Sequence, residues 1–164
     1  MRVLSENLIA IQNSHQITDF SPSVSIELTA TSDDIDALGH MNNAVYVNWL
    51  DQAQLVHTFS LGITPEVMKS THCALVVRHT DLLYLAALRE DETATIGTCI
   101  TACDGKLRLQ RRFQMVRRKD GLTLLRGEIE YVAIDFRKGR PRRMPGIFAD
   151  ILTKAIVEQE QKTV

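Results

Sequence analysis

The amino-acid sequence predicts an α+β fold in which a curled antiparallel sheet of five strands wraps around one long central helix. Three patterns predict this fold: a strand-like alternation from Val24, an apolar helical repeat from Asn43 to Ser60, and further strand patterns between Cys73 and Asp135. With 164 residues, 45% of them apolar and 24% charged, the chain suits one globular domain with a core of its own.

The first and last segments are expected to lie outside this domain. Residues 1–22 show no sustained period and close at Ser21-Pro22, so we expect an N-terminal arm or short helix there. The main domain then spans residues 23–148. Residues 149–164 are expected to form a C-terminal helix, because apolar residues recur at helical spacing near the chain end.

The domain opens with a strand and a helix. Apolar and polar residues alternate from Val24 to Ala30, which indicates a half-buried strand. The central helix is expected from Asn43 to Ser60, where apolar residues face several sides and Asp51 is the only formal charge. A helix this apolar is expected to be buried on several sides, as if wrapped by the sheet.

Four consecutive long antiparallel strands follow the helix. Turn signals separate them, and Asp104-Gly105 between two of them is a strong hairpin signal. The expected strands cover residues 73–84, 93–103, 106–117 and 122–135.

Charge and composition exclude several classes of protein. The net charge is −1 and the pI about 6.5, which gives no support to binding of nucleic acid or of a membrane surface. The sequence has no apolar run of membrane-spanning length and no signal-peptide pattern, so we expect a cytoplasmic protein. The three cysteines and His57, His72 and His79 lack ligand spacing, so we expect no metal and no cofactor.

The segment Asp36–Tyr46 gathers an acid, a glycine, a histidine and two asparagines at the start of the helical pattern. The first N–H groups of a helix have no intrahelical acceptors, so a helix N-terminus stabilises an anion. An oxyanion could therefore form near Asn42 and Asn43, with the Asp36 carboxylate held beside it on the preceding loop.

Each residue of this segment also has a purely structural interpretation. Asp36 could merely cap a turn. Asp33 and Asp34 suit solvated loop charges, although either could be the acid if the loop had a different register. His40 could order the loop by hydrogen bonding rather than transfer a proton. The two asparagines are good helix caps and need no further role.

Three blocks in this chain resemble one known family. They are Asp36-x-x-Gly-His-x-Asn-Asn-x-x-Tyr46, Leu83-Tyr-Leu-Ala86 with acidic residues shortly after it, and Val132-Ala-Ile-Asp135 followed by Arg140-Pro-x-x-Met-Pro145. In this order they resemble the hot-dog-fold thioesterases related to 4-hydroxybenzoyl-CoA thioesterase and the small bacterial acyl-CoA thioester hydrolases. The resemblance covers roughly residues 23–148 and implies a hot-dog fold for the chain.

The resemblance implies a role for several residues. In that family the acid before the glycine is the catalytic carboxylate, a nucleophile or a general base for water, and it corresponds to Asp36. The backbone N–H that polarises the carbonyl corresponds to Asn43. The plant acyl-carrier-protein thioesterases have a similar motif that matches Asp36, His40, Asn42 and Asn43, but Leu38 stands at its middle asparagine. This departure favours Asp36 as the main acting group, with His40 in support.

The implied activity is hydrolysis of acyl-CoA or acyl-carrier-protein thioesters. The expected substrate-binding residues are Gly39, Asn42, Tyr46, Trp49, Arg140, Arg142 and Arg143. The two aromatic side chains suit a core as well as a substrate wall. The arginines could bind the phosphates of coenzyme A, or the acidic surface of an acyl carrier protein.

Two other functions remain open. A hot-dog dehydratase or hydratase would need a His-Phe-Pro-type loop, which the sequence lacks, and an acid on the central helix, where Asp51 is the only one. A non-catalytic acyl-CoA-binding module would keep the pocket and lose the base. We expect at least a homodimer, because pairing between subunits covers the edge strands of the sheet. The family resemblance implies the same arrangement, often extended to a homotetramer.

We predict that thioester hydrolysis by this chain survives exhaustive chelation, because the sequence contains neither metal-ligand spacing nor a glycine-rich phosphate loop. The measurement is free-thiol release before and after dialysis against EDTA. Loss of turnover that zinc or magnesium restored would contradict the prediction.

Overall fold

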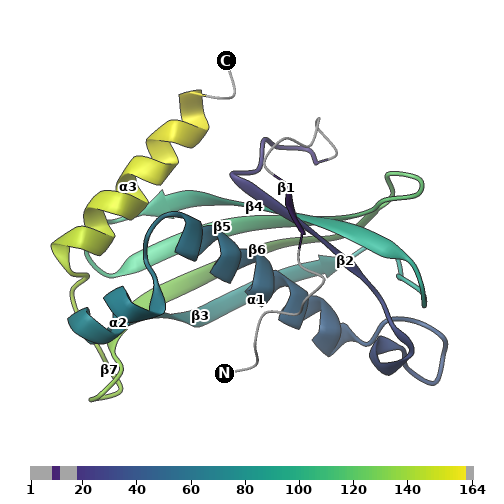
Figure 1. The fold of residues 1–164 in the computed structure, drawn as a ribbon, viewed down its shortest axis with the longest axis horizontal. Coiled ribbons are helices and arrows are strands. Elements are labelled where there is room, and N and C mark those ends of the chain that lie inside the picture. Colours follow the sequence, from purple (N-terminus) through teal and green to yellow (C-terminus); the bar gives the residue numbers. More distant parts are fainter. Residues whose placement is uncertain (1–8, 12–17, 162–164) are drawn as a thin grey trace.

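The computed structural model describes residues 9–11 and 18–161, and its curled sheet with a long helix confirms the α+β class (Figure 1). All strand pairs are antiparallel, and the order in the sheet is β1-β2-β4-β5-β6-β3, with β7 beside β6. The strands are β1 Ile9–Ile11, β2 Val24–Thr29, β3 Cys73–Tyr84, β4 Thr93–Cys103, β5 Arg108–Arg117, β6 Thr123–Asp135 and β7 Arg140–Pro141. The helices are the 3-10 turn η1 Ser32–Asp34, α1 Asn43–Ser60, α2 Pro65–Thr71 and α3 Gly146–Gln161.

The five long strands lie where the sequence predicts them, but the sheet contains two further short strands, β1 and β7. Strand β1 pairs with β2 and so places part of the expected N-terminal arm in the sheet. Strand β7 pairs with the end of β6. Neither short strand is long enough for an alternation of apolar and polar residues to reveal it.

Strand β3 lies at one edge of the sheet beside β6, not beside β4, which follows it in the chain. Short turns join β4 to β5 and β5 to β6, so those strands pair with their chain neighbours. The connection from β3 to β4 covers residues 85–92 and is long enough to cross the sheet. Among the described residues, β3 is paired with β6 alone, and most of its side chains are partly or fully exposed.

Helix α1 begins at the predicted residue because Asn42 caps it. The Oδ1 atom of Asn42 accepts a hydrogen bond from the N–H of Ala44 at 2.9 Å. One face of α1 packs on β2 and β4 and is buried. The opposite face is open in the single chain, where Val47 is 42% exposed, so the expectation of burial on several sides is wrong here. The sheet of one chain meets only one side of the helix.

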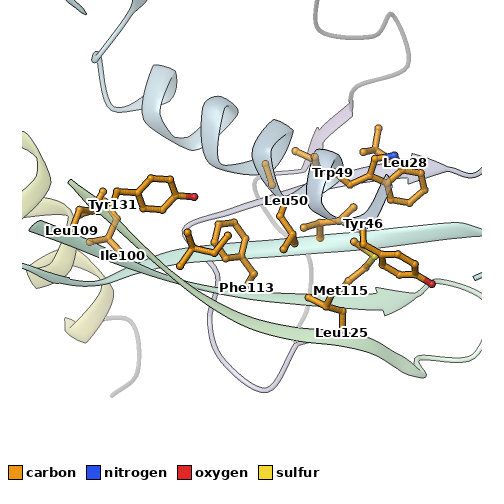
Figure 2. Close-up of a cluster of buried hydrophobic side chains, with 14 of the residues drawn as sticks. Leu28, Tyr46, Trp49, Leu50, Ile100, Leu109, Phe113, Met115, Leu125 and Tyr131 are labelled. Carbon is orange, nitrogen blue, oxygen red and sulfur yellow. The ribbon is translucent and has the colours of Figure 1, made fainter. Parts of the chain in front are cut away.

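The hydrophobic core fills the space between α1 and the concave face of the sheet (Figure 2). Leu50 from the helix is fully buried together with Phe113 and Met115 from β5. Leu125 on the neighbouring strand β6 is fully buried as well. Full burial of one such side chain stabilises the fold by about 1.5–3 kcal/mol, so this contact fixes the position of α1 on the sheet.

A buried arginine on β5 joins the second half of α1 to the sheet. Arg111 is 0% exposed, and its Nη1 lies 2.7 Å from Nδ1 of His57 while Nη2 donates to Oγ1 of Thr58 at 2.9 Å. Because a guanidinium can only donate, Nδ1 of His57 is the acceptor and the ring carries its proton on Nε2. Burial lowers the pKa of Arg111 to about 10. The alternation of apolar and polar residues in β5 did not reveal this polar contact, because Arg111 stands at a core position of the strand.

Helix α3 packs on β4 through Phe148 and Leu152, which are fully buried. It begins at Gly146, three residues before the expected boundary at 149. The expectations for residues 1–8, 12–17 and 162–164 lie outside the described residues. Within the described part of the chain, no helix is long and apolar enough to cross a membrane.

Candidate active site

The loop before α1 folds back on Asp36. Its Oδ1 atom accepts hydrogen bonds from the N–H groups of Leu38 at 2.8 Å and His40 at 3.2 Å. The backbone closes the same turn, since the N–H of Asp36 donates to the carbonyl of His40 at 2.8 Å. Gly39 has a φ of +76°, a left-handed conformation that glycine adopts without strain. One oxygen of the Asp36 carboxylate is therefore fixed, and the other has no hydrogen-bond partner among the described residues.

The first turn of α1 presents an N–H group with no acceptor. The side chain of Asn42 accepts from Ala44, and the backbone N–H of Asn42 donates to the carbonyl of Asp34 at 2.9 Å. Asn43 is the first helical residue and is exposed, and in the described part of the chain its N–H has no backbone acceptor. This N–H points along the positive end of the helix dipole, where an oxyanion is stabilised.

An open cleft of about 300 Å³ joins these groups. It is lined by Asp36, His40, Met41, Asn43, Tyr46, Tyr84, Leu85, Ala86 and Ala87. The structure thus brings together four of the predicted site residues, namely the acid, the histidine, the first helical asparagine and the tyrosine. Gly39 and Asn42 act beside the cleft, through the turn and the helix cap.

Sequence reasoning assigned no site role to the segment after β3, which forms one wall of the cleft. Leu83–Ala86 carried part of the family resemblance, and that was the only signal for this wall. The ring of Tyr84 packs edge-on against Tyr46, with centroids 5.5 Å apart and the planes at 89°. Tyr46 is only 2% exposed, and its hydroxyl accepts the N–H of Leu88 at 2.8 Å. Burial raises the pKa of Tyr46, so its hydroxyl stays neutral.

The alternative acids of the loop have different surroundings. The Oδ2 atom of Asp34 accepts both the N–H and the hydroxyl of Thr31, each at 2.9 Å, so this carboxylate caps η1. Asp33 lies in the same exposed turn and does not line the cleft. The geometry therefore favours Asp36 among the acids of this loop.

Other predicted residues lie elsewhere in the fold. Trp49 is 5% exposed and belongs to the core. The three arginines lie at the opposite end of β3, where Nη1 of Arg142 donates to the carbonyl of Thr71 at 2.9 Å. A second cleft of about 300 Å³ there is lined by Lys106, Leu107, Pro141, Arg142 and Arg143. Strand β3 has 12 residues. The eleven steps between its ends, at about 3.3 Å each, separate the two clefts by roughly 36 Å.

A larger cavity of about 370 Å³ lies between Phe20, β5, β6 and β3. Its carboxylates include Asp19, paired with Arg126, and Glu128, paired with Arg112 at 3.3 Å. These two carboxylates are poor bases because guanidinium groups hold them, and the third carboxylate of the cavity, Asp81, has no helix N-terminus of the described chain beside it to stabilise an oxyanion, so we do not assign the chemistry to this cavity. Among the described residues, no group of three or more His, Cys, Asp or Glu side chains is arranged to hold a metal ion.

Comparison with known proteins identifies the family of this chain. The sequence profile of the thioesterase-like superfamily matches residues 30–154, and the chain belongs to that family. A candidate esterase of Synechocystis sp., sll0410, is 31% identical over 113 residues, which are 68% of each protein. The present chain shares the hot-dog fold of a DHNA-CoA thioesterase from Staphylococcus aureus, at a TM-score of 0.76 and 17% identity over 85% of this chain and 95% of that one.

A second solved structure with the same fold was determined with coenzyme A. It is the hypothetical protein SAV2348 from Staphylococcus aureus, with a TM-score of 0.75 and 21% identity over 82% of this chain and 84% of that one. At such identities the likeness establishes the hot-dog fold, which confirms the expected architecture.

We predict that Asn42→Ala lowers the free energy of unfolding by about 1 kcal/mol, because the cap of α1 is lost. Asn42→Asp keeps an acceptor for the N–H of Ala44 and should retain most of the stability. Urea unfolding of the two variants and the wild type measures the difference. Equal losses in both variants would contradict a capping role.

Proposed function

We propose that this protein hydrolyses acyl-CoA or acyl-carrier-protein thioesters to a free carboxylic acid and a thiol, with Asp36 as general base or nucleophile. The observation that carries the proposal is the presence of the Asp36 carboxylate and the Asn43 N–H in one cleft. A thioester has an activated carbonyl and a good thiolate leaving group, so one base or nucleophile and one oxyanion donor suffice for hydrolysis.

The reaction starts from the oxygen of Asp36 that the turn does not occupy. As a general base, this oxygen takes a proton from water while the water oxygen attacks the thioester carbonyl carbon. As a nucleophile, it attacks that carbon itself and forms an acyl-aspartyl anhydride, which water then hydrolyses. On either route the negative charge develops on the carbonyl oxygen, which accepts the N–H of Asn43. This tetrahedral intermediate collapses with cleavage of the carbon–sulfur bond, which on the nucleophilic route gives the anhydride before water attacks it. The leaving thiolate takes up a proton to give the thiol, from Asp36 on the general-base route or from solvent on the nucleophilic route.

The substrate is expected to contact the cleft through its thioester and the basic cluster through its phosphates. Arg140, Arg142 and Arg143 carry the guanidinium groups that bind phosphate in bidentate fashion. Within one chain this cluster lies too far along β3 from Asp36 for one coenzyme A molecule to contact both. The complex of SAV2348 with coenzyme A supports a CoA-type substrate.

A second copy of the chain would remove this difficulty. If two β3 edges pair antiparallel about a two-fold axis, the beginning of one strand lies beside the end of the other. The basic cluster of one copy then lies beside the cleft of its partner. The same pairing covers the exposed edge of β3, whose Val77 and Leu83 are 53% and 57% exposed.

We predict that Asp36→Asn lowers kcat/KM for thioester hydrolysis by about 10²–10⁴-fold, because the variant lacks the base or nucleophile. His40→Ala should lose less, since that side chain acts in support. Asp33→Asn is the matched control and should hydrolyse at the wild-type rate. Near-wild-type turnover by Asp36→Asn on the best of a panel of acyl-CoA and acyl-carrier-protein thioesters would refute the assignment.

We also predict that the protein is a homodimer or homotetramer in solution. Light scattering coupled to size exclusion should report about twice or four times the chain mass of 18.5 kDa. A monomer with full activity would contradict both the oligomer and the shared site.

A further inference from the structure

The main chain of Leu88 joins the two halves of the candidate active site. Its N–H donates to the hydroxyl of Tyr46 on α1 at 2.8 Å, and its carbonyl accepts the N–H of Met41 at 2.8 Å. Met41 immediately precedes the helix cap and follows the turn that carries Asp36. All three bonded residues are almost fully buried, so water does not compete for these hydrogen bonds.

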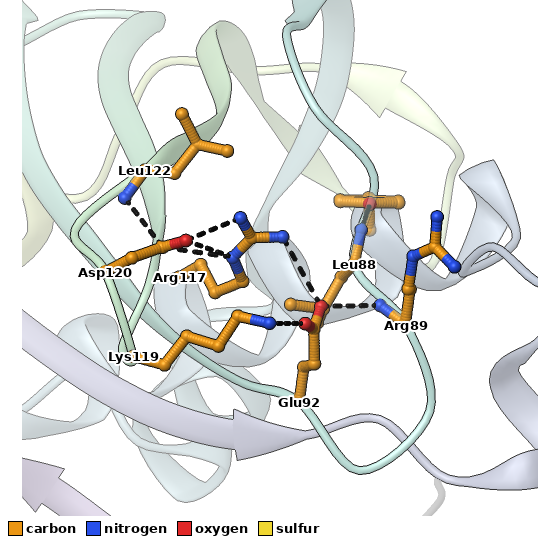
Figure 3. Close-up of polar contacts among 8 residues, drawn as sticks. Leu88, Arg89, Glu92, Arg117, Lys119, Asp120 and Leu122 are labelled. Carbon is orange, nitrogen blue, oxygen red and sulfur yellow. Dashed lines mark hydrogen bonds and ion pairs between the residues drawn. The ribbon is translucent and has the colours of Figure 1, made fainter.

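The segment that carries Leu88 is held at its far end by Glu92 (Figure 3). One oxygen of the Glu92 carboxylate accepts the backbone N–H of Arg89 at 2.9 Å. The carboxylate also pairs with Arg117 at 3.6 Å and with Lys119 from the turn between β5 and β6. Arg117 is held in turn by Asp120, at 2.6 Å.

Glu92, Arg117, Lys119 and Asp120 form a cluster of ion pairs, the Glu92 cluster, which persists at neutral pH. The side chains of Glu92 and Arg117 are only 12% and 15% exposed. Burial raises the pKa of Glu92, but the contacts with Lys119, the N–H of Arg89 and Arg117 outweigh it, and the pKa lies below its ordinary value. The carboxylate is therefore ionised and its partners remain bound.

Backbone hydrogen bonds hold the segment at both of its ends. The N–H of Leu85 donates to the carbonyl of Leu124 at 2.8 Å, and the carbonyl of Glu92 accepts the N–H of Ala30 at 3.0 Å. Between these two points, the hydroxyl of Tyr46 is the side-chain contact that holds Leu88 against α1. Residues 85–87 form one wall of the cleft, so their distance from the Asn43 N–H depends on the Tyr46 and Glu92 contacts.

We propose that Tyr46 and Glu92 are positioning residues, which hold residues 85–92 so that the cleft wall, the Asp36 turn and the first turn of α1 keep a fixed spacing. For Tyr46 this replaces the expected role in substrate binding. Its buried hydroxyl accepts the Leu88 N–H. The inference deepens the proposed thioester hydrolysis and rests on it for its kinetic consequence.

The first test is Tyr46→Phe, which keeps the buried ring and removes only the acceptor of the Leu88 N–H. A shift of about 1 Å in a catalytic arrangement costs roughly 100-fold in rate, so kcat should fall by about 10- to 100-fold while KM changes by less than about threefold. Tyr131→Phe is the matched control. It deletes the hydroxyl of another tyrosine that is 2% exposed, on β6 and outside the cleft, and should keep the wild-type kcat.

The second test is Glu92→Gln, with Glu128→Gln as its control. Glu128 forms an exposed ion pair with Arg112, away from residues 85–92. Glu92→Gln should lower kcat by about 3- to 10-fold. Added salt should lower the kcat of the wild type, because salt screens the ion pairs of Glu92. In Glu92→Gln this salt dependence should be lost. Glu128→Gln should leave both kcat and its salt dependence unchanged.

Amide hydrogen exchange provides a readout that does not depend on activity. Exchange at Leu88 and Met41 should become at least about tenfold faster in Tyr46→Phe, and stay unchanged in Tyr131→Phe. Wild-type kcat together with wild-type exchange in Tyr46→Phe would overturn the positioning role. Faster exchange in a protein that hydrolyses no thioester would uphold the contact and refute the proposed function instead, so the two failures are distinguishable.

Discussion

The site depends on where helix α1 begins. Asn42 caps the helix with its side chain and donates its backbone N–H to Asp34, while the adjacent Met41 donates to Leu88. These three hydrogen bonds fix the first turn of α1 against both the preceding loop and the segment after β3. The free N–H of the helix and the carboxylate of Asp36 are therefore set in one cleft before any substrate binds, and such preorganisation is the main source of oxyanion stabilisation in enzymes.

The charges of the molecule are divided between the two ends of β3. The Asp36 carboxylate lies on a tight turn beside the cleft, and an arginine cluster around β7 lies at the other end of β3. Within the described residues, β3 is paired on one side only, with β6. A second copy can therefore complete both the sheet and the site. The exposed face of α1 lies on the side of the helix that the sheet of one chain does not meet.

Much of the fold follows from the sequence. The long elements have strong periods, and α1 starts where the asparagine cap predicts it. The acid, the histidine and Asn43 could be grouped as candidate site residues from the sequence because they lie within one short segment, and they line one cleft. The wall after β3 and the Glu92 cluster join residues far apart in the chain, such as Glu92 with Arg117, and periodicity carries no information on such pairs. Arg111 was missed because a charged residue at a core position contradicts the pattern that predicts its strand.

The most direct test of the account is a crystal structure of the protein with an acyl-CoA analogue in which a methylene group replaces the thioester sulfur. The ketone of this analogue resists hydrolysis and leaves its carbonyl in place. We predict that the carbonyl oxygen lies about 3 Å from the backbone nitrogen of Asn43, with the free oxygen of Asp36 facing the carbonyl carbon. A carbonyl bound away from the α1 N-terminus, with Asp36 still turned into its own loop, would contradict it.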